Sequence, residues 1–500
     1  MSSPPPKLVL CVIDAMAPAM LERAIAAGVA PVLERLVADG RYVPDCVAAF
    51  PSVTPVCAAS IVTGTGQDRH EIPGMNWFHR DEHRYVEYGS SFRAAQRFGI
   101  ARQLTDTVYN MNRAHLSQRT PTVFETLDDA GVRTAGTTYL MYRGRHRHEP
   151  QRDSTLTRVA AALMRHPVMG PRELFYADVF ASRRTGCRSV LGMPGVRDRH
   201  SGCVSAYLVE HDLFDFLLLS LPDNDWYSHK RGPEAQIQSL GQADLQLARV
   251  MNAAGGVEEF LAEHAVIAMA DHSQAPVTAT IAIQDELAEL GVLGPGRSNG
   301  ARDRAAGGEP RIAVCPSQRA AMVYALHESE RDAMRASVVS RALAVEGVDL
   351  VLWLERDAHD RPREGVIASP TRGEMRFAPA GELFDPRGLR WSVEGELAAI
   401  EASVHDGRLL SPAYPDALAR AWSALTCRTS GEVLLSAAPG YEFVDWGRQA
   451  HVGGGSHGSL AATDSEVPML TVGLGDPPAS IIGIKQLLLE HFGVGVARAA

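Results

Sequence analysis

The stretch LLLSLPDNDWYSHKRGP, from Leu217 to Pro233, decides how the fold is interpreted. Its first part is a short apolar run, which is typical of a buried strand. The run stops at Pro222, and two aspartates, an aromatic pair, a histidine and two cations follow within a few positions. A buried strand that ends in Asp223, Asp225 and His229 would place chemically active side chains at the edge of a sheet.

Other apolar runs elsewhere in the chain are also followed by polar residues. They are KLVLCVID (7–14), FDFLLLSL (214–221) and HAVIAMAD (264–271). Helical patterns lie between them, including one helix expected from Pro18 to a stop at Gly40. Continuous apolar strands that alternate with helices predict an α/β fold, with a mostly parallel sheet and helices on both faces. Functional residues of such sheets lie at the carboxyl ends of the strands.

The middle of the chain has a different pattern. A Gly/Arg-rich loop at 294–310 is followed by short strand-like runs separated by turns, and an apolar run returns at 467–474. We therefore expect a discontinuous catalytic core, residues 1–274 and 445–500, and a smaller, partly antiparallel α+β insertion over 275–444 that covers the core like a cap.

Charge and composition exclude some classes of protein. The 500 residues carry a formal net charge of −10, with 45% hydrophobic and 22% charged residues. This balance is close to that of an average globular protein and argues against a partner that is a nucleic-acid polymer or an anionic membrane. Any phosphate chemistry would need local positive charge, for instance a bound metal. The oligomeric state is left open.

Seven cysteines are scattered through the chain without a CxxC pair. We expect neither a zinc knuckle nor a disulfide framework, and interpret most of them as small buried hydrophobic residues. Unpaired cysteines favour a reducing compartment. The apolar run after Lys7 is too short to span a membrane, and Asp14 after it does not suit a signal-peptide cleavage site. The predicted location is the cytoplasm.

Candidate catalytic residues begin with Asp14 and Thr54. Asp14 follows the first strand. In AFPSVTPVCAASIVTG, Pro55 suits the first position of a helix and Thr54 suits the N-cap. A hydroxyl there would lie where the helix dipole and backbone N–H groups favour an anion. Cys57 is a rival nucleophile, but its apolar neighbours favour a core position.

Candidate metal ligands follow the later strands. Asp225 and His229 are four residues apart, a spacing that can direct both side chains at one cation. Asp223 competes with Asp225 as the carboxylate and is otherwise a turn residue. Asp271 and His272 are adjacent, so both can reach a metal only where the strand has ended.

The last candidate is His457, in the glycine loop HVGGGSHGSL, with His451 as its alternative. The combined set has three aspartates, three histidines and one threonine: Asp14, Asp225, Asp271, His229, His272, His457 and Thr54. Nitrogen and oxygen ligands without thiolate suit zinc or a similar divalent ion. Divided between two ions about 4 Å apart, they would suit an in-line phosphoryl displacement.

These motifs resemble the type I phosphodiesterase/nucleotide pyrophosphatase family of the alkaline phosphatase superfamily. The likeness rests on FPSVTP, HEIPGMNWF, ADHS, GSHGSL and DWYSHKRGP, the last matching the family string D-x-x-x-H-x-x-G-P from Asp225. It covers roughly residues 7–275 and 445–490 and implies an alkaline-phosphatase-like core. The chain departs from the family at Glu71 and Ser228, where the family usually or often has glycine.

The resemblance also implies a role for each matched residue. Thr54 would be the nucleophile, and Asn76 would donate a hydrogen bond to a non-bridging phosphate oxygen. Two divalent ions are implied, zinc or alternatively manganese or iron. One would be held by Asp14, Thr54, Asp271 and His272, and the other by Asp225, His229 and His457.

The expected function is therefore a metal-dependent hydrolase that cleaves phosphodiester or nucleotide-type pyrophosphate bonds of a small molecule through a phospho-threonine intermediate. A phosphomonoesterase or phosphonate hydrolase on the same site, and a non-catalytic binding protein, are the alternatives. A monoester carries an extra negative charge and needs an added cation. No arginine stands beside Thr54 in the sequence, which favours diesters.

Several side chains could contact the substrate. The candidates for an added cation are Arg143, Arg145, His146 and Lys230. The candidates for other substrate contacts are Trp77, Tyr227 and Lys230, with core packing as the alternative for Trp77 and a structural role for Tyr227 and Lys230.

Overall fold

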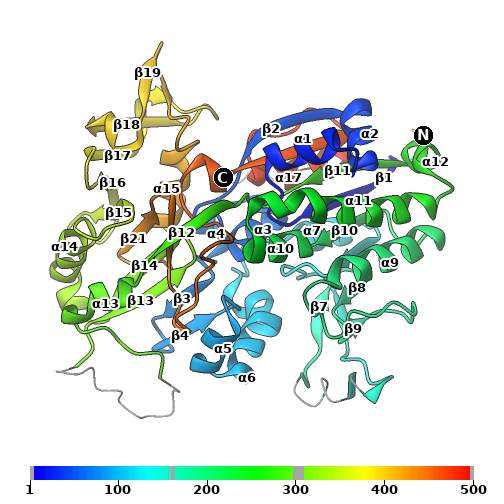
Figure 1. The fold of residues 1–500 in the computed structure, drawn as a ribbon, viewed down its shortest axis with the longest axis horizontal. Coiled ribbons are helices and arrows are strands. Elements are labelled where there is room, and N and C mark those ends of the chain that lie inside the picture. The colour runs from blue at the N-terminus through cyan, green and yellow to red at the C-terminus, as the bar shows by residue number, and fades with distance from the viewer. Residues whose placement is uncertain (1–4, 156, 159–160, 162–163, 297–308, 496–500) are drawn as a thin grey trace.

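The computed structural model describes residues 5–155, 157–158, 161, 164–296 and 309–495. Its first sheet has eight strands in the order β2-β24-β11-β1-β10-β5-β8-β9 (Figure 1). The strands are β1 (Lys7–Ile13), β2 (Arg41–Val47), β5 (Thr134–Thr137), β8 (Glu173–Tyr176), β9 (Phe180–Ala181), β10 (Phe216–Leu221), β11 (His264–Met269) and β24 (Glu466–Val472). The five central pairings are parallel except where β24 joins β11, which confirms the mostly parallel α/β core.

The register of the central strands fixes where the site is built. β1 pairs in parallel with both β10 and β11, and Ile13 lies opposite Leu221 while Val12 lies opposite Met269. Because the three strands end level with one another, the residues that follow them emerge at the same edge of the sheet.

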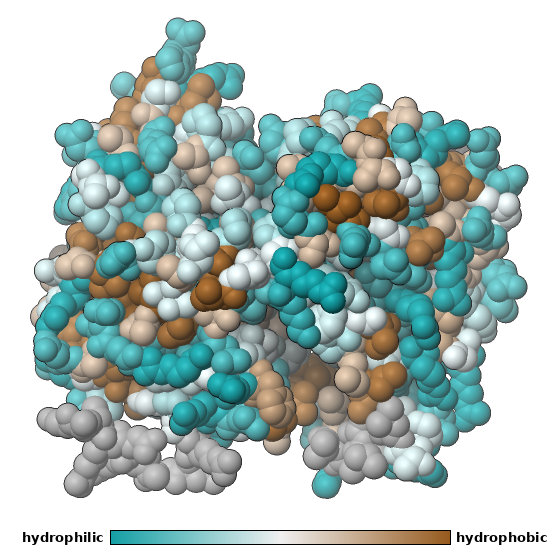
Figure 2. Space-filling model, in the orientation of Figure 1, coloured by the Kyte–Doolittle hydropathy of each residue, from teal (hydrophilic) through white to brown (hydrophobic). Residues whose placement is uncertain are grey.

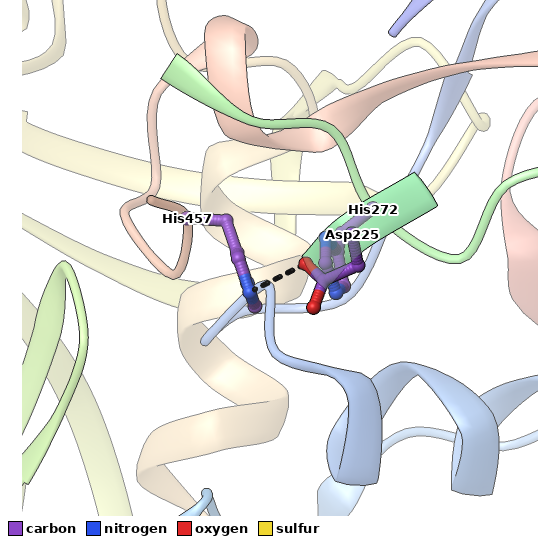
Figure 3. A group of neighbouring side chains, drawn as sticks. All are labelled: Asp225, His272 and His457. Atoms are coloured by element: carbon purple, nitrogen blue, oxygen red, sulfur yellow. Dashed lines mark ion pairs between the residues drawn. The ribbon is translucent and has the colours of Figure 1, made fainter. Parts of the chain in front are cut away.

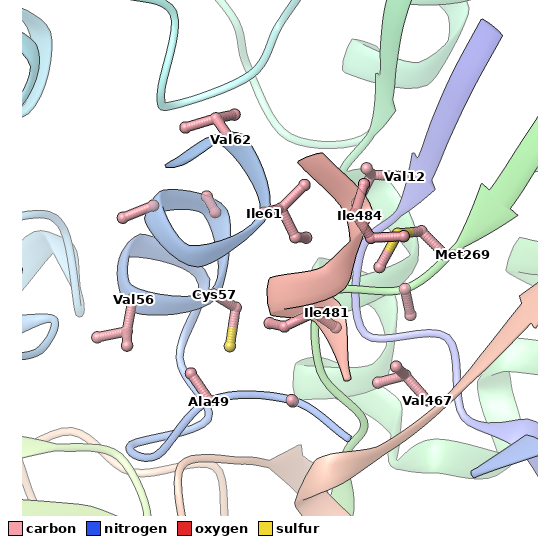
Figure 4. Packing of buried hydrophobic residues seen from close by; sticks show 14 of the residues in the cluster. Val12, Ala49, Val56, Cys57, Ile61, Val62, Met269, Val467, Ile481 and Ile484 are labelled. Atoms are coloured by element: carbon pink, nitrogen blue, oxygen red, sulfur yellow. The ribbon is translucent and has the colours of Figure 1, made fainter. Parts of the chain in front are cut away.

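Helices cover both faces of this sheet (Figure 1). One layer consists of α1 (Pro18–Ala26), α2 (Pro31–Asp39), α9 (Arg197–Glu210), α11 (Gln236–Asn252) and α12 (Val257–Glu263). The other consists of α3 (Thr54–Thr63), α7 (Val123–Asp129) and α17 (Ile484–His491). Figure 4 shows α3 packed beside α17, with Cys57, Ile61 and Ile484 among the buried side chains. This packing holds the start of α3 in a fixed place next to the strand ends.

The single helix expected from Pro18 to Gly40 is wrong, because the structure has two helices there. Gly28 adopts a left-handed φ of 69° after the end of α1, and Pro31 begins α2. A residue with positive φ cannot continue a right-handed helix, so the chain turns at this point.

A second sheet of nine strands forms from residues 312–437. Its strands are β13 (Ile312–Ser317), β14 (Ala320–Ala325), β15 (Val348–Arg356), β16 (Pro362–Ser369), β17 (Gly373–Phe384), β18 (Arg390–Gly395), β19 (Ser403–His405), β20 (Arg408–Leu410) and β21 (Val433–Ala437). All described pairings except β17 with β20 are antiparallel. The division into a core and an insertion at 275 and 444 remains a proposal.

Alternating side chains of the second sheet serve two hydrophobic clusters. Ala313 and Cys315 belong to the large cluster that includes the first sheet, whereas Ile312 and Val314 face a separate cluster with α14 (Arg331–Ala342). This is the period of two expected of a strand. One face of the second sheet is therefore continuous with the core that supports the strand ends.

The cysteines give a second correction. Cys187 and Cys203 form a disulfide that was not expected, whereas the other five cysteines are free and buried, as expected for most of them. The cysteine argument for a reducing compartment loses its force, and the cytoplasmic location stays a prediction. Within the described ranges, no helix combines the length and apolar character of a membrane span. Most of the Gly/Arg-rich loop, residues 297–308, lies outside the described residues.

Candidate active site

Three carboxylates meet at the level ends of the central strands. Asp14 directly follows β1, and Asp271 comes two residues after β11. Asp225 lies in the first turn of α10 (Asp223–Arg231), and only Pro222 separates this helix from the end of β10. The parallel register brings all three to one place, and all three line the same cavity.

Two histidines, His272 and His457, lie beside these carboxylates, and Figure 3 shows both together with Asp225. His272 Nε2 is 3.5 Å from Asp14 Oδ1 and 3.7 Å from Asp271 Oδ2. His457 Nε2 is 3.5 Å from Asp225 Oδ1, and its ring stacks on that of His272 with centroids 3.6 Å apart. These side chains form two groups, and within each group the possible ligand atoms lie within 4.8 Å of one another. One group is Asp14, Asp271 and His272, and the other is Asp225, His272 and His457.

His229 extends the second group. It lies one helical turn after Asp225 on α10, with its Nε2 3.2 Å from Asp225 Oδ1. The predicted i, i+4 geometry is therefore present, on a helix rather than a loop.

All three imidazoles are oriented in the same way by the backbone. The Nδ1 of His229 lies 2.7 Å from Gly455 O, that of His457 2.7 Å from Ser52 O, and that of His272 3.2 Å from Ser273 O. Because a carbonyl oxygen only accepts, each Nδ1 carries the proton and donates it. In the neutral ring each Nε2 is then an acceptor directed at the carboxylates, the arrangement found in metal-binding histidines.

Thr54 is the first residue of α3, and its N-cap is Val53 rather than Thr54 itself. The Thr54 hydroxyl does not cap the helix but lies 3.1 Å from His272 Nε2, to which it can donate. It remains at the positive end of the helix dipole, as expected. Cys57 is buried in the core, and burial raises the pKa of its thiol well above the usual range, so it is not a competing nucleophile.

The electrostatics of the cluster favour a bound cation. Burial, and then the charges of Asp271 and Asp225, raise the pKa of Asp14 well above its ordinary value. Asp14 Oδ1 is buried without a hydrogen-bond partner in the described structure. Burial alone would raise the pKa of Asp225, but His229, His457 and His272 hold it far below the usual range. An unpartnered buried oxygen among converging carboxylates and Nε2 acceptors fits a divalent ion.

A cavity of about 350 Å³ opens beside Thr54 and the three carboxylates. Its walls are mainly apolar and aromatic, and include Met75, Tyr88, Leu104, Tyr139, Tyr176 and Leu191. Figure 2 shows the surface hollowed between the region of α5 (Phe92–Phe98) and α6 (Ile100–Thr105) and that of β7 (Val168–Gly170), with brown side chains at the rim. The site can therefore accept a small molecule with an apolar part.

Residues 8–370 of the chain match the sequence profile of type I phosphodiesterase / nucleotide pyrophosphatase. The chain belongs to this family. The match covers well over half of the sequence, including Asp14, Thr54, Asp225 and Asp271. No curated protein sequence matches the chain.

Two solved structures show the same fold as this family member. Phosphonoacetate hydrolase from Sinorhizobium meliloti 1021, in complex with phosphonoformate, is 17% identical with a TM-score of 0.54, over 98% of this chain and 96% of that one. Murine ectonucleotide pyrophosphatase/phosphodiesterase 5 is 11% identical with a TM-score of 0.57, over 99% and 97%. The family is metal-dependent. Membership in it indicates that the chain is a hydrolase of the phosphodiesterase and pyrophosphatase type, and a small phosphate-ester substrate fits the family.

Asn76 is not brought together with the other predicted residues of this family member. It lies in β3 (Asn76–His79), is buried, and its Nδ2 donates to Val86 O at 2.9 Å across the hairpin. At this point the described wall of the cavity is formed by Met75. One N–H of the Asn76 amide is used in the hairpin, and its role as a donor to a phosphate oxygen stays a prediction.

The predicted substrate contacts also lie away from the described cavity wall. Trp77 is 2% exposed and stacks on His79. Tyr227 lines a separate surface pocket, and Lys230 Nζ lies 3.9 Å from the ring centre of Trp226. Trp77 therefore belongs to the core, whereas Tyr227 is half-buried at the surface.

Two functional residues were missed from the sequence. Gln274 is buried, and its Nε2 donates to Asp225 Oδ1, which orients that carboxylate. Arg197 lines the cavity, at the start of α9. Gln274 could have been noticed two residues after His272, but nothing near Arg197 in the sequence marks a strand end. Asp223, the rejected alternative to Asp225, holds the Arg197 guanidinium.

Proposed function

We propose that this chain is a metal-dependent hydrolase that cleaves phosphodiester or nucleotide-type pyrophosphate bonds with Thr54 as the nucleophile. The observation that carries the proposal is the Thr54 hydroxyl. It lies at the head of α3 in a cavity lined by Asp14, Asp225 and Asp271, and 3.1 Å from the Nε2 of the buried His272. A hydroxyl held beside this many potential metal ligands is in a place where its pKa can fall.

The proposed ligand sets are those implied by the family resemblance, and the contacts support them. Divalent ions bound here would lower the pKa of a hydroxyl and offset negative charge on phosphorus. One ion would be held by Asp14, Thr54, Asp271 and His272, and the other by Asp225, His229 and His457. Zinc is the proposed metal, with manganese or iron as alternatives, since all three accept nitrogen and oxygen ligands.

The reaction would take place in two displacements. Thr54 Oγ1 releases its proton to solvent and forms a bond to phosphorus, while the bond from phosphorus to the leaving oxygen breaks. The electron pair stays on the leaving oxygen, which takes up a proton from solvent. The positive end of the α3 dipole holds the phosphoryl oxygens. Water then attacks the phospho-threonine, and Thr54 Oγ1 leaves with the electron pair and regains a proton. The apolar walls hold the leaving group.

The test pairs metal content with turnover of bis-p-nitrophenyl phosphate and p-nitrophenyl phosphate. We expect about two equivalents of metal in the purified protein, and a loss of at least about 1000-fold in kcat for Thr54→Ala without loss of metal or fold. Thr105→Ala, an exposed threonine on α6, is the matched control and should behave as wild type.

Substantial hydrolysis by Thr54→Ala would exclude Thr54 as the nucleophile. A wild-type protein that binds neither zinc nor manganese and hydrolyses neither ester would support the alternative of a binding protein that has kept the fold. Loss of activity after treatment with a chelator, and recovery on adding one metal, would identify the ion.

A further inference from the structure

The charge distribution in the cavity is uneven. Three carboxylates and the hydroxyl of Thr54 line its wall. Among the described residues of the wall, Arg197 is the only basic side chain. Of the other cations considered from the sequence, Arg143 is used elsewhere, because it is buried and donates to the carbonyls of Leu116 and Ser117.

Two of the three nitrogens of the Arg197 guanidinium are bound by acceptors of the protein. Its Nε donates to Asp223 Oδ1 at 2.9 Å and its Nη2 to Pro222 O at 3.0 Å. The Asp223 carboxylate also accepts the backbone N–H groups of Gly195 and Asp198, which fixes the start of α9. No described contact uses Nη1. The guanidinium is thus oriented in advance, with donors left for a ligand.

Its position relative to the reacting end follows from the fold. Pro222, which accepts from Arg197, follows β10 and precedes Asp225 by three residues. Asp14 N in turn donates to Leu221 O, so the residues around Arg197 are neighbours of the proposed metal ligands. Mainly apolar walls lower the local dielectric and strengthen any ion pair that forms there.

We propose that Arg197 recognises a second negative charge on the substrate, so that this enzyme prefers phosphoryl compounds with more than the single charge of a simple diester. The inference rests on the proposed function and concerns the charge of the substrate that the same site accepts. The second charge can lie on the scissile group itself, as in a phosphate monoester or phosphonate, or on an adjacent phosphate, as in a nucleotide pyrophosphate. A planar guanidinium with free N–H groups suits either anion.

The experiment compares three substrates in the metal-loaded enzyme. Methyl p-nitrophenyl phosphate carries one negative charge, and p-nitrophenyl phosphate carries two on one phosphate group. UDP-glucose carries one negative charge on each of its two phosphate groups. For Arg197→Gln, we expect kcat/KM to fall about 10- to 100-fold on the doubly charged substrate that wild type prefers, and less than about 3-fold on the methyl ester. The doubly charged substrate whose kcat/KM falls shows whether Arg197 recognises a charge on the scissile group or on an adjacent phosphate.

The controls separate binding from folding. Arg199→Gln, an exposed residue on the same helix, should leave all three rates unchanged. Arg197→Lys should keep part of the preference, because it retains the charge but not the planar fork. Retained turnover of the methyl ester by Arg197→Gln shows an intact site. The inhibition constant of inorganic phosphate should rise about 10-fold in the same variant.

Equal losses on singly and doubly charged substrates, or no loss on either, would overturn the inference while leaving the proposed function standing. If wild type hydrolyses none of the three substrates with any divalent metal, the proposed function itself fails.

Discussion

Single residues at this site gain their properties from being crowded together in a buried place. Asp14, Asp225 and Asp271 are buried or nearly so, and their negative charges repel one another. His272 lies within 4.8 Å of the ligand atoms of both carboxylate groups. Such a cluster is costly without a cation and stable with one, so the effect of a substitution should depend on the metal.

Replacing Asp14 with asparagine tests this dependence. In chelator-treated protein we expect the variant to be more stable than wild type by about 1–3 kcal/mol, because one of three repelling buried charges is gone. With metal present, we expect the order to reverse and the metal content to fall. Thermal unfolding with and without chelator, together with metal analysis, checks both. Lower stability under both conditions would mean that the Asp14 charge is compensated by the protein alone.

Glu87 gives a pH dependence with a definite sign. Burial raises the pKa of its carboxyl to about 7, although the N–H groups of Ser90 and Gly89 favour the charged form. The folded state therefore binds the proton more tightly than the unfolded chain, and this term lowers the stability of wild type as pH rises from about 4.5 to about 7. Glu87→Gln removes the term.

We expect the free energy of unfolding of Glu87→Gln, relative to wild type, to increase by about 3 kcal/mol between pH 4.5 and pH 8. Urea unfolding at several pH values measures it, and the exposed Glu34→Gln serves as the matched control. A difference that does not change with pH would show that Glu87 is not protonated in the folded state.

At the scale of elements, the ends of helices and strands do the positioning. The start of α3 presents Thr54, the first two turns of α10 present Asp225 and His229, and the start of α9 presents Arg197. The end of α4 (Gln67–His70) explains a departure from the family pattern. Glu71 adopts a left-handed φ of 65° there, the conformation that glycine takes most easily.

Glu71 also pairs with two arginines, so two variants are needed to separate backbone from side chain. Its partners Arg119 and Arg428 are 85% and 67% exposed, and such pairs contribute little. We expect Glu71→Gly to be more stable than Glu71→Ala by about 1 kcal/mol, because only alanine keeps a Cβ in the left-handed region. Denaturant unfolding of both variants measures the difference. Equal stabilities would indicate that the loop relaxes to another conformation.

At the scale of the whole molecule, the second sheet supports the first. Arg319, in the turn between β13 and β14, donates through its backbone N–H to His457 O at 2.8 Å. Its side chain is fully buried and pairs with the equally buried Asp464, whose other oxygen accepts the N–H of Ser459. The loop that carries His457 is thus held by a residue about 140 positions away along the chain.

Breaking this pair should affect both stability and metal binding. We expect Arg319→Met to lose about 3–5 kcal/mol, since it leaves Asp464 buried without a cation, and to bind less metal. Adding Asp464→Asn should cost less than the sum of the two single changes. The control is Arg341→Met, which breaks the exposed pair with Glu289 and should cost under about 1 kcal/mol. Additive effects would mean that the pair is not coupled.

The sequence by itself determined the strands and the residues that follow them. Apolar runs such as Phe216–Leu221 are local signals, and strand ends that lie level in a parallel sheet must bring Asp14, Asp225 and Asp271 together. The spacing from Asp225 to His229 carried the same information within one helix turn. For these reasons the proposed ligand set could be predicted before the fold was known.

Only the tertiary structure decided what surrounds this set. The residues around it come from a helix start (Arg197), a loop (Gln274) and a turn of the second sheet (Arg319). No local pattern in the sequence marks such contacts. Asn76 carried the family motif, yet the β3 hairpin uses its amide. Side-chain partners across long separations depend on how the layers pack, which periodicity along the chain does not encode.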